Sequence, residues 1–238
     1  MSISLKRARA IFVKDYKEFS RNYALSIMLL FPIILALLLR AAGAASSLPG
    51  SFATVLNLSF VFLTCFAQTC LIAEEKERNT LRSLMMTPAT SMDVLIGKSA
   101  LVFVMSVVAL AIAKYLFGYE PASLWAFVAA ILLSIILYTA VGTICALFSK
   151  TLLDASLSVI PVSIVFSAAP WGAFIVNEYP VLKVLDYMPS SQLVHLLGLP
   201  PTEFTTGELL LPLLIILAWT VVLTIVSVVL YQRRLMDE

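Results

Sequence analysis

Charge is scarce in this sequence: 13% of its 238 residues are Asp, Glu, Lys or Arg, whereas 61% are hydrophobic. A soluble domain carries about 25% charged residues, so this chain lacks the polar side chains that would cover a water-exposed surface. Its mean hydropathy is +1.00. These values exclude an ordinary soluble protein and predict an all-α polytopic membrane protein. The net charge of +2 is too small to indicate nucleic-acid binding.

Histidine and cysteine are also scarce, which argues against a metal centre or a catalytic site. The chain has one histidine, His195, and three cysteines, Cys65, Cys70 and Cys145, which lie inside apolar runs without a CxxC pair. HExxH and GxSxG motifs are absent from the sequence. We therefore expect no catalytic residue, no metal and no cofactor. His195 should lie on the surface, and the cysteines should pack as small apolar side chains.

Glycine is rare as well, and one is missing where a phosphate-binding loop would require it. Gly97-Lys98-Ser99 matches the end of such a loop, but the pattern needs a second glycine five places before Gly97, where Met92 stands. Asp93 would place a carboxylate beside the phosphates. We therefore expect that this chain does not bind ATP itself.

Long apolar runs are abundant. A helix needs about 20 apolar residues to cross the hydrocarbon core of a bilayer, and six runs meet this requirement. Pro32, Pro161 and Pro170 lie inside runs and are predicted to kink their helices. The six predicted spans are Tyr23–Ala42, Phe52–Ala73, Ser99–Gly118, Ser123–Phe148, Ala155–Val176 and Leu209–Tyr231.

The basic residues are distributed unevenly between the two sides that these spans would create. If the N-terminus is cytoplasmic, thirteen of the sixteen Lys and Arg residues lie inside, and only Arg40, Lys114 and Lys183 lie outside. Cytoplasmic loops carry the excess of positive charge in membrane proteins. We therefore predict that both termini are cytoplasmic. A bacterial cell membrane is the expected location.

Residues 1–22 are predicted to form an amphipathic helix in the membrane interface. The alternative is a secretory signal peptide, because residues 41–45 resemble a cleavage site. The long polar start, which contains Asp15 and Glu18, disfavours it. At helical spacing, the apolar face would hold Leu5, Ala8, Phe12, Tyr16, Phe19 and Tyr23, and the basic face Arg7, Lys14, Lys17 and Arg21.

Residues 74–98 carry eight charges between two apolar spans. Each charge would cost about 2.5–3.5 kcal/mol at mid-bilayer, so this segment must lie in water. Thr80 is predicted to cap a short helix with an apolar stripe of Leu81, Leu84 and Met85, which Pro88 ends. A solvated loop with an incidental helical turn is the alternative.

Ser91 is predicted to cap the next helix, with Asp93 near its positive end. This helix would run through Gly97 and Lys98 into the third span. Lys98 would then lie at the membrane boundary and extend its ammonium group to the cytoplasmic interface.

This segment resembles the signature of the ABC type-2 transporter permease family. That signature has an acidic-basic-Glu motif, then Gly-Thr-Leu-Glu, a leucine pair, Thr-Pro and a closing Gly-Lys. Asn79 replaces the usual glycine, although asparagine tolerates the left-handed backbone, and Arg82 replaces the usual glutamate. The matching residues are Glu75-Lys76-Glu77-Arg78, Asn79-Thr80-Leu81, Leu84, Thr87-Pro88 and Gly97-Lys98.

The resemblance implies that residues 1–238 form a single permease domain of an ATP-driven exporter. Two permease subunits, either two copies of this chain or this chain and a relative, would line the pathway. Two copies of a separate ATP-binding cassette ATPase would drive it. Lys150 and Asp154, in the connector 149–154, would form a second, smaller contact with the ATPase. The main contact, the coupling helix, would use Glu77, Thr80, Leu81, Arg82, Leu84 and Met85.

An external segment, 177–208, precedes the last span and contains the Pro-centred stretch Tyr187–Leu193, which is similar to the family's. Ser190 or Ser191 is predicted to cap a short helix there that ends at Gly198. Val194, Leu196 and Leu197 would let this helix dip into the outer leaflet.

Two other classes of membrane protein compete with this interpretation: an ion-coupled carrier, and a scaffold without an ATPase partner. A carrier usually places Asp, Glu or His near mid-membrane, and the second, fourth and fifth predicted spans contain no charge. Asn57 and Gln68 are polar within the second span, and we expect them to hydrogen-bond between helices. Spans without buried charge favour an amphipathic or hydrophobic cargo, such as a drug, a peptide or a lipid, although polymer export stays open.

Overall fold

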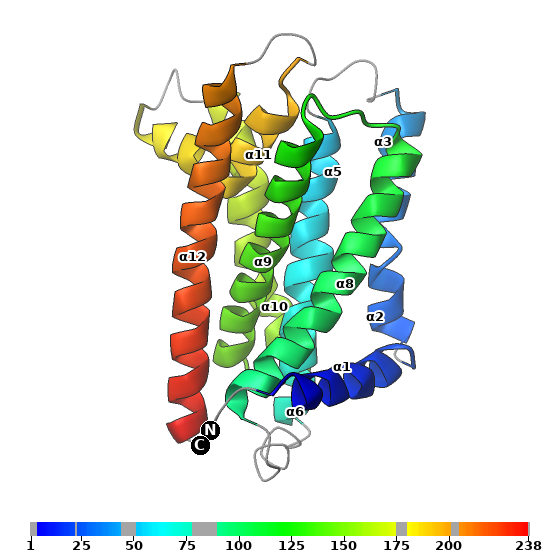
Figure 1. The fold of residues 1–238 in the computed structure, drawn as a ribbon, viewed down its shortest axis with the longest axis vertical. Helices are drawn as coiled ribbons and strands as arrows, with labels where there is room; N and C mark the ends of the chain where they lie inside the picture. The colour runs from blue at the N-terminus through cyan, green and yellow to red at the C-terminus, as the bar shows by residue number, and fades with distance from the viewer. Residues whose placement is uncertain are drawn as a thin grey trace.

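The computed structural model describes residues 4–21, 23–43, 51–77, 90–174, 180–200 and 205–237. These residues form helices joined by short turns, which confirms the all-α fold (Figure 1). The α-helices are α1 (Leu5–Phe19), α2 (Tyr23–Met28), α3 (Phe31–Ala41), α5 (Ser51–Ser59), α6 (Phe66–Glu77), α8 (Ser91–Phe117), α9 (Leu124–Phe148), α10 (Leu152–Ala168), α11 (Pro189–Leu197) and α12 (Thr206–Asp237). The π-helix η1 (Phe60–Cys65) joins α5 to α6, and η2 (Ala169–Phe174) and η3 (Pro180–Tyr187) are 3₁₀-helices.

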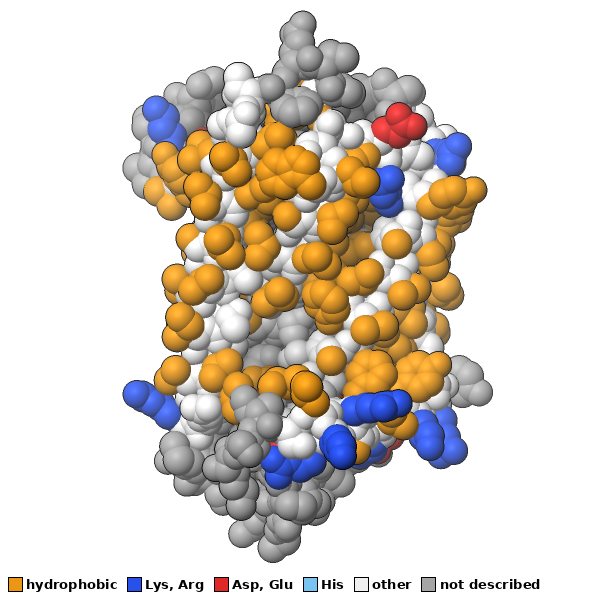
Figure 2. Space-filling view, viewed as in Figure 1, with side chains coloured by type: hydrophobic (Ala, Val, Ile, Leu, Met, Phe, Trp, Pro, Cys, Tyr) orange, Lys and Arg blue, Asp and Glu red, His pale blue; other side chains and the backbone are white. Residues whose placement is uncertain are grey.

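Five helices among the described residues are long and apolar enough to cross a bilayer. Each lies on one of the last five predicted runs. A wide belt of hydrophobic side chains covers the middle of the face seen in Figure 2. The five spans are Ser51–Glu77, Met92–Phe117, Leu124–Phe148, Leu152–Gly172 and Thr206–Arg233.

The first predicted span, Tyr23–Ala42, forms a shorter and interrupted structure. A turn at Leu29 and Leu30 separates α2 from α3. Pro32 lies in the first turn of α3, where the missing proline N–H would have no helical acceptor and costs nothing. The proline therefore begins a new helix instead of kinking a continuous one.

The α5–η1–α6 span is the centre of the bundle. Of its most apolar stretch, 83% is buried inside the protein, against 22% for the spans of α10 and α12. Helix α9 packs closely on this span at Gly142, where there is no space for a side chain. A Cβ atom on Gly142 would lie 2.5 Å from the carbonyl oxygen of Cys65. The weakly buried α10 and α12 therefore present apolar faces outward, toward lipid or another subunit.

Polar side chains of the central span bond to neighbouring helices, as predicted for Asn57 and Gln68. The Asn57 amide donates to the carbonyl of Ser190 at 3.1 Å, and the Gln68 amide donates to the Thr143 hydroxyl at 3.1 Å. Such bonds satisfy polar groups within the bundle. The three cysteines are buried and free, and His195 is exposed.

At one end of the bundle, α11 packs into the protein. Its N-cap is Met188, with Pro189 as the first helical residue and no side-chain cap, so the predicted serine cap is wrong. Proline suits this position because it needs no N–H partner there. The Ser191 hydroxyl donates instead to the backbone carbonyl of Leu185. The helix ends at Gly198, as predicted. Leu196 and Leu197 are buried and so do not enter the leaflet.

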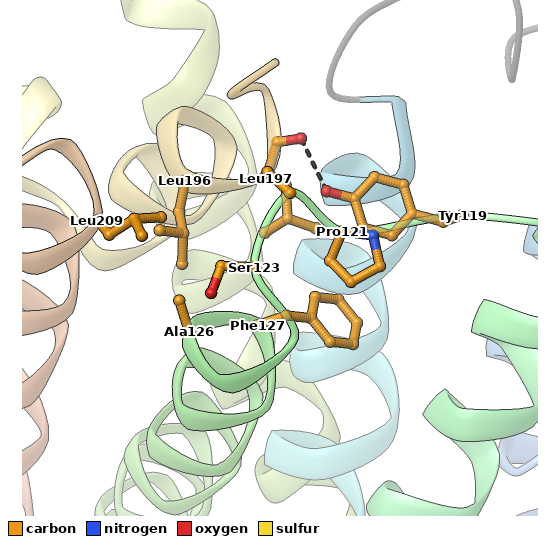
Figure 3. A pocket seen from close by; sticks show the side chains of 9 residues that line it. Tyr119, Pro121, Ser123, Ala126, Phe127, Leu196, Leu197 and Leu209 are labelled. Carbon is orange, nitrogen blue, oxygen red and sulfur yellow. Dashed lines mark hydrogen bonds between the residues drawn. The ribbon is translucent and has the colours of Figure 1, made fainter. Parts of the chain in front are cut away.

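A small pocket lies beside α11, between the α8–α9 turn and the start of α12 (Figure 3). Tyr119 closes one side, and its hydroxyl donates to the carbonyl of Leu197 at 2.8 Å. The pocket has room for about one water molecule, so it is too small for a transported substrate. At the same end, Arg40 donates to the carbonyl of Leu116, and the ammonium of Lys114 lies 5.9 Å from the ring centroid of Phe127.

Helix α1 lies across the other end of the bundle, roughly perpendicular to the spans (Figure 1). It packs on α8 through Ala8, Ile11 and Phe19, and it also buries Asp15. Leu5 and Tyr16, which were predicted on one apolar face with Ala8 and Phe19, are 80% and 53% exposed. We call this end of the molecule the basic end, because α1 and the end of α12 place exposed Lys and Arg side chains there (Figure 2).

Candidate functional site

The segment that the sequence predicts to be cytoplasmic begins where α6 ends, at the basic end. Four consecutive charged residues close this helix, and the last three of them are Glu75, Lys76 and Glu77. Successive side chains on a helix point about 100° apart, so each of the three reaches a different part of the protein. We call these three residues and their direct partners the α6 hub.

Glu75 connects α6 to α1 and α8. Its Oε1 accepts a hydrogen bond from the Lys14 ammonium at 2.7 Å, and its Oε2 lies 3.0 Å from the Lys98 ammonium. Lys98 also lies 3.3 Å from Asp15 Oδ2 and donates to the carbonyl of Leu71. Lys98 and Asp15 are each 1% exposed, so this is a buried ion-pair network in which Asp15 and Glu75 face both Lys14 and Lys98.

Lys98 does not extend to the interface, and the prediction that it does was wrong. The residue before it explains why: a Cβ atom on Gly97 would lie 2.9 Å from the carbonyl oxygen of Ala8 and from Cβ of Ile11. Glycine thus allows α1 to lie directly on α8, and α1 then covers Lys98. A buried ammonium group is tolerable only with opposite charges and hydrogen-bond acceptors around it, and Asp15 and Glu75 supply them.

The charges around Asp15 shift the pKa of two groups on α1. Burial raises the pKa of the Asp15 carboxyl; Lys98 opposes this effect and the nearby Glu75 adds to it. Burial alone would lower the pKa of Lys14, but its hydrogen bond with Glu75 and the surrounding acids outweigh burial and raise it. Lys14 therefore stays charged against Glu75.

Three acidic residues in this network, Asp15, Glu18 and Glu75, lie close enough together to hold a cation. The ammonium groups of Lys14 and Lys98 already occupy the space between them, with Lys14 lying 3.6 Å from Asp15 and 3.7 Å from Glu18. Two lysines thus serve as the cations of this cluster. We assign it as an ion-pair network and not as a metal centre.

Lys76 connects α6 to the end of α9. Its ammonium donates to the carbonyls of Ala146, Leu147 and Ser149 at 3.3, 3.2 and 2.7 Å. The last carbonyls of a helix have no partner within the helix and form its negative end. Lys76 satisfies three carbonyls at and just beyond the end of α9 at once, which fixes α9 to α6.

Glu77 connects α6 to the start of α10. Its Oε2 accepts a hydrogen bond from the backbone N–H of Leu152 at 2.7 Å. A carboxylate is favourable at a helix N-terminus because the free N–H groups there carry partial positive charge. The hydroxyl of Thr151 caps the same helix by accepting from the N–H of Asp154.

A family model described as ABC-2 family transporter protein matches residues 40–229 of the chain. The chain belongs to the ABC-2 family. This match confirms the resemblance drawn from Glu75–Lys98, and the chain is therefore the permease, or membrane component, of an ABC transporter. Members of this family generally pair with ATP-binding subunits and are generally not catalytic themselves. A comparison with curated proteins gives no match.

The structure brings part of the predicted contact surface of this ABC-2 permease together. Glu77 lies beside the connector 149–154, and Lys150 and Asp154 are exposed next to it. Thr80, Leu81, Arg82, Leu84 and Met85 lie outside the described residues, so the coupling helix stays a prediction. The two ends of that segment are nonetheless described, at Glu77 and at Thr90.

Helix α8 of the permease starts one residue earlier than predicted, because Thr90 and not Ser91 is its N-cap. The Thr90 hydroxyl accepts from the N–H of Asp93 at 3.1 Å, and the Asp93 carboxylate accepts from the N–H of Thr90 at 2.9 Å. This is a capping box. Asp93 also pairs with Arg7 at 3.0 Å and accepts from the N–H of Ser4, so the starts of α8 and α1 are joined.

Proposed function

We propose that this ABC-2 permease is half of an exporter that moves an amphipathic or hydrophobic substrate outward. Two copies of a separate ATP-binding cassette ATPase would bind its cytoplasmic side, and a second permease subunit would complete the pathway. The α6 hub is the observation that carries this proposal. Segment 78–89 begins at the hub and returns at α8, so its two ends lie on helices that are bonded together.

Displacement of segment 78–89 would act on much of the bundle through the hub. Glu75 bonds to α1 and α8, Lys76 to the end of α9, and Glu77 to the start of α10. Tyr231 of α12 packs near these ends with Leu95 and Leu147. An ATPase that moves the coupling helix would therefore move several spanning helices together, as alternating access requires.

The orientation follows from the charge asymmetry. Segment 78–89 leaves α6 at the basic end, which the positive-inside rule assigns to the cytoplasm, where ATP is available. The poorly buried faces of α10 and α12 leave room for a second permease subunit.

The proposed substrate class rests on the chemistry of the spans. The polar side chains of Asn57 and Gln68 are used in bonds to neighbouring helices, and the buried ion pairs lie at the basic end. An amphipathic or hydrophobic substrate suits spans of this kind.

The test is to purify the full chain from its native membrane with its bound proteins and to identify any ATPase. The complex should hydrolyse ATP, and candidate drugs, peptides or lipids that are substrates should stimulate hydrolysis. The chain alone should show no saturable nucleotide binding, because Met92 interrupts the phosphate loop. Recovery of the chain without an ATPase would favour a scaffold, and transport driven by an ion gradient without ATP would favour a carrier.

A further inference from the structure

The outward surface of α1 is not used by the α6 hub. Lys6, Arg9, Lys17 and Arg21 are exposed along α1 and the turn that follows it, and we call them the α1 basic face. Their charged ends form no ion pair with the part of the chain that the structure describes. The inward-facing cations of the same helix differ, because Arg7 pairs with Asp93 and Lys14 with Glu75. The unpaired positive charge of α1 is thus confined to its outward surface.

Exposed apolar side chains accompany these cations. Leu5, Tyr16 and Val13 are 80%, 53% and 43% exposed. Leu5 and Arg9 are one helical turn apart, and Tyr16 lies on the same face. A helix that lies across the end of the spans and mixes exposed apolar and basic residues suits the boundary between acyl chains and headgroups. In Figure 2, Lys and Arg side chains gather at the basic end, directly below the hydrophobic belt.

We propose that the α1 basic face is a binding site for anionic phospholipids in the leaflet at the basic end. The apolar side chains would enter the acyl region, and the flexible stems of Lys and Arg would place their charges at the lipid phosphates. The acidic surface of a protein is a less suitable partner, because it would leave Leu5 and Tyr16 against charged groups. The acids of α1 do not oppose a lipid phosphate, since Asp15 is buried and Glu18 lies by Lys14.

Lipid at this site would act on the helix that covers the α6 hub. Lys14 and Asp15 connect α1 to Glu75 and Lys98 on one side of the helix, while the α1 basic face would connect it to the headgroups on the other. The lipid would hold α1 in the plane of the membrane and against α8. This binding needs no ATPase, so it can be tested on the permease alone and separately from the proposed function.

The experiment uses the purified full chain and native mass spectrometry, with titration of phosphatidylglycerol or of phosphatidylcholine. The wild type should bind phosphatidylglycerol more tightly. The variant Lys6→Gln/Lys17→Gln should raise the dissociation constant for phosphatidylglycerol by about fivefold for each lysine removed at low ionic strength. Its affinity for phosphatidylcholine should not change.

Two controls separate a lipid site from a general effect of charge. Lys114→Gln/Lys183→Gln removes the same charge from the opposite end and should leave the affinity for phosphatidylglycerol unchanged, and Lys6→Arg/Lys17→Arg should retain it. Thermal unfolding followed by tryptophan fluorescence confirms that each variant is folded. The proposal is overturned if the wild type shows no preference for phosphatidylglycerol. It is equally overturned if Lys6→Gln/Lys17→Gln binds like the wild type, or if both double glutamine variants weaken binding equally.

Discussion

At the scale of single residues, the structure gives each end of the family signature a physical role. Glu75 and Lys98 are 23 positions apart in the sequence and meet at 3.0 Å in the α6 hub. Lys76 and Glu77 hold the end of one helix and the start of another. Gly97 and Lys98, which resemble the end of a phosphate loop in sequence, have structural roles in this protein. The glycine makes space for α1, and the lysine neutralises the acids that α1 and α6 bring to it.

Lys98→Met should destabilise the protein by about 3–5 kcal/mol, because it leaves two buried acids with only Lys14 as a counter-charge. Asp15→Asn/Lys98→Met, which removes both charges of one buried pair and keeps Glu75 with Lys14, should recover most of this loss. The measurement is thermal unfolding of the purified chain in detergent. Lys150→Met, a change at an exposed lysine, is the control and should stay within about 0.5 kcal/mol. Equal effects at Lys98 and Lys150 would show that the buried network contributes nothing.

At the scale of helices, the sequence predicts which helices exist better than it predicts which helices pack against one another. The apolar runs indicate the last five spans because a bilayer imposes a minimum length on any spanning helix. The burial of Asp15 was not predicted, although Ala8 lies seven residues before it, Ile11 four before it and Phe19 four after it. These helical spacings mark Asp15 as a member of the same face. A carboxylate on an apolar stripe signals a cation on another helix, but the sequence alone does not say which one. The cap at Thr90 was missed for a local reason, since Thr90 and Ser91 are both good caps and only Thr90 has an acid three residues later.

Gly97→Ala should loosen α1 from α8. Alanine favours a helix over glycine by about 1 kcal/mol, yet the new methyl group would meet the Ala8 carbonyl and the Ile11 side chain at 2.9 Å. We expect a net destabilisation of about 1–3 kcal/mol from overpacking and faster amide hydrogen exchange in α1. Gly207→Ala is the matched control, because its nearest neighbour would be the Thr205 hydroxyl at 3.9 Å. If exchange in α1 is the same in both variants, the close approach of α1 to α8 does not depend on Gly97.

The coupling helix predicted over residues 80–86 can be tested in the complex with the ATPase. Leu84→Asp/Met85→Asp should insert into the membrane at normal levels but fail to retain the ATPase. Each new carboxylate would be buried without a partner at the interface with the ATPase, which costs about 3–5 kcal/mol. Thr80→Ala should have a smaller effect, about 1 kcal/mol for a lost cap. Ser83→Asp/Met86→Asp puts the same charges on the opposite face and serves as the control. The measurement is the amount of ATPase recovered per permease, and full recovery with Leu84→Asp/Met85→Asp would indicate a solvated loop.

At the scale of the whole molecule, the two ends of the bundle differ in what holds them together. The basic end carries the α6 hub, where ion pairs and helix caps join α1, α6, α8, α9 and α10. At the opposite end, α11 and the α8–α9 turn are packed mainly through apolar and aromatic side chains, with Tyr119 stacked on Phe52 at 4.8 Å. A membrane protein that receives force at one end needs that end to be connected to several helices. This difference between the two ends agrees with the uneven distribution of Lys and Arg in the sequence.

The membrane topology is predicted from the basic residues at one end of the bundle and can be tested in intact cells. Lys150 lies at the basic end and Thr205 precedes α12 at the opposite end, and both are exposed. Single cysteines are introduced as Lys150→Cys and Thr205→Cys in a background in which Cys65, Cys70 and Cys145 are replaced by alanine or serine. The membrane-impermeant thiol reagent should label Thr205→Cys in intact cells and Lys150→Cys only after the membrane is permeabilised, because the positive-inside rule places the basic end in the cytoplasm. The reverse labelling pattern would mean that the protein has the opposite orientation in the membrane. Segment 78–89 would then lie outside the cell, and coupling to a cytoplasmic ATPase would be excluded.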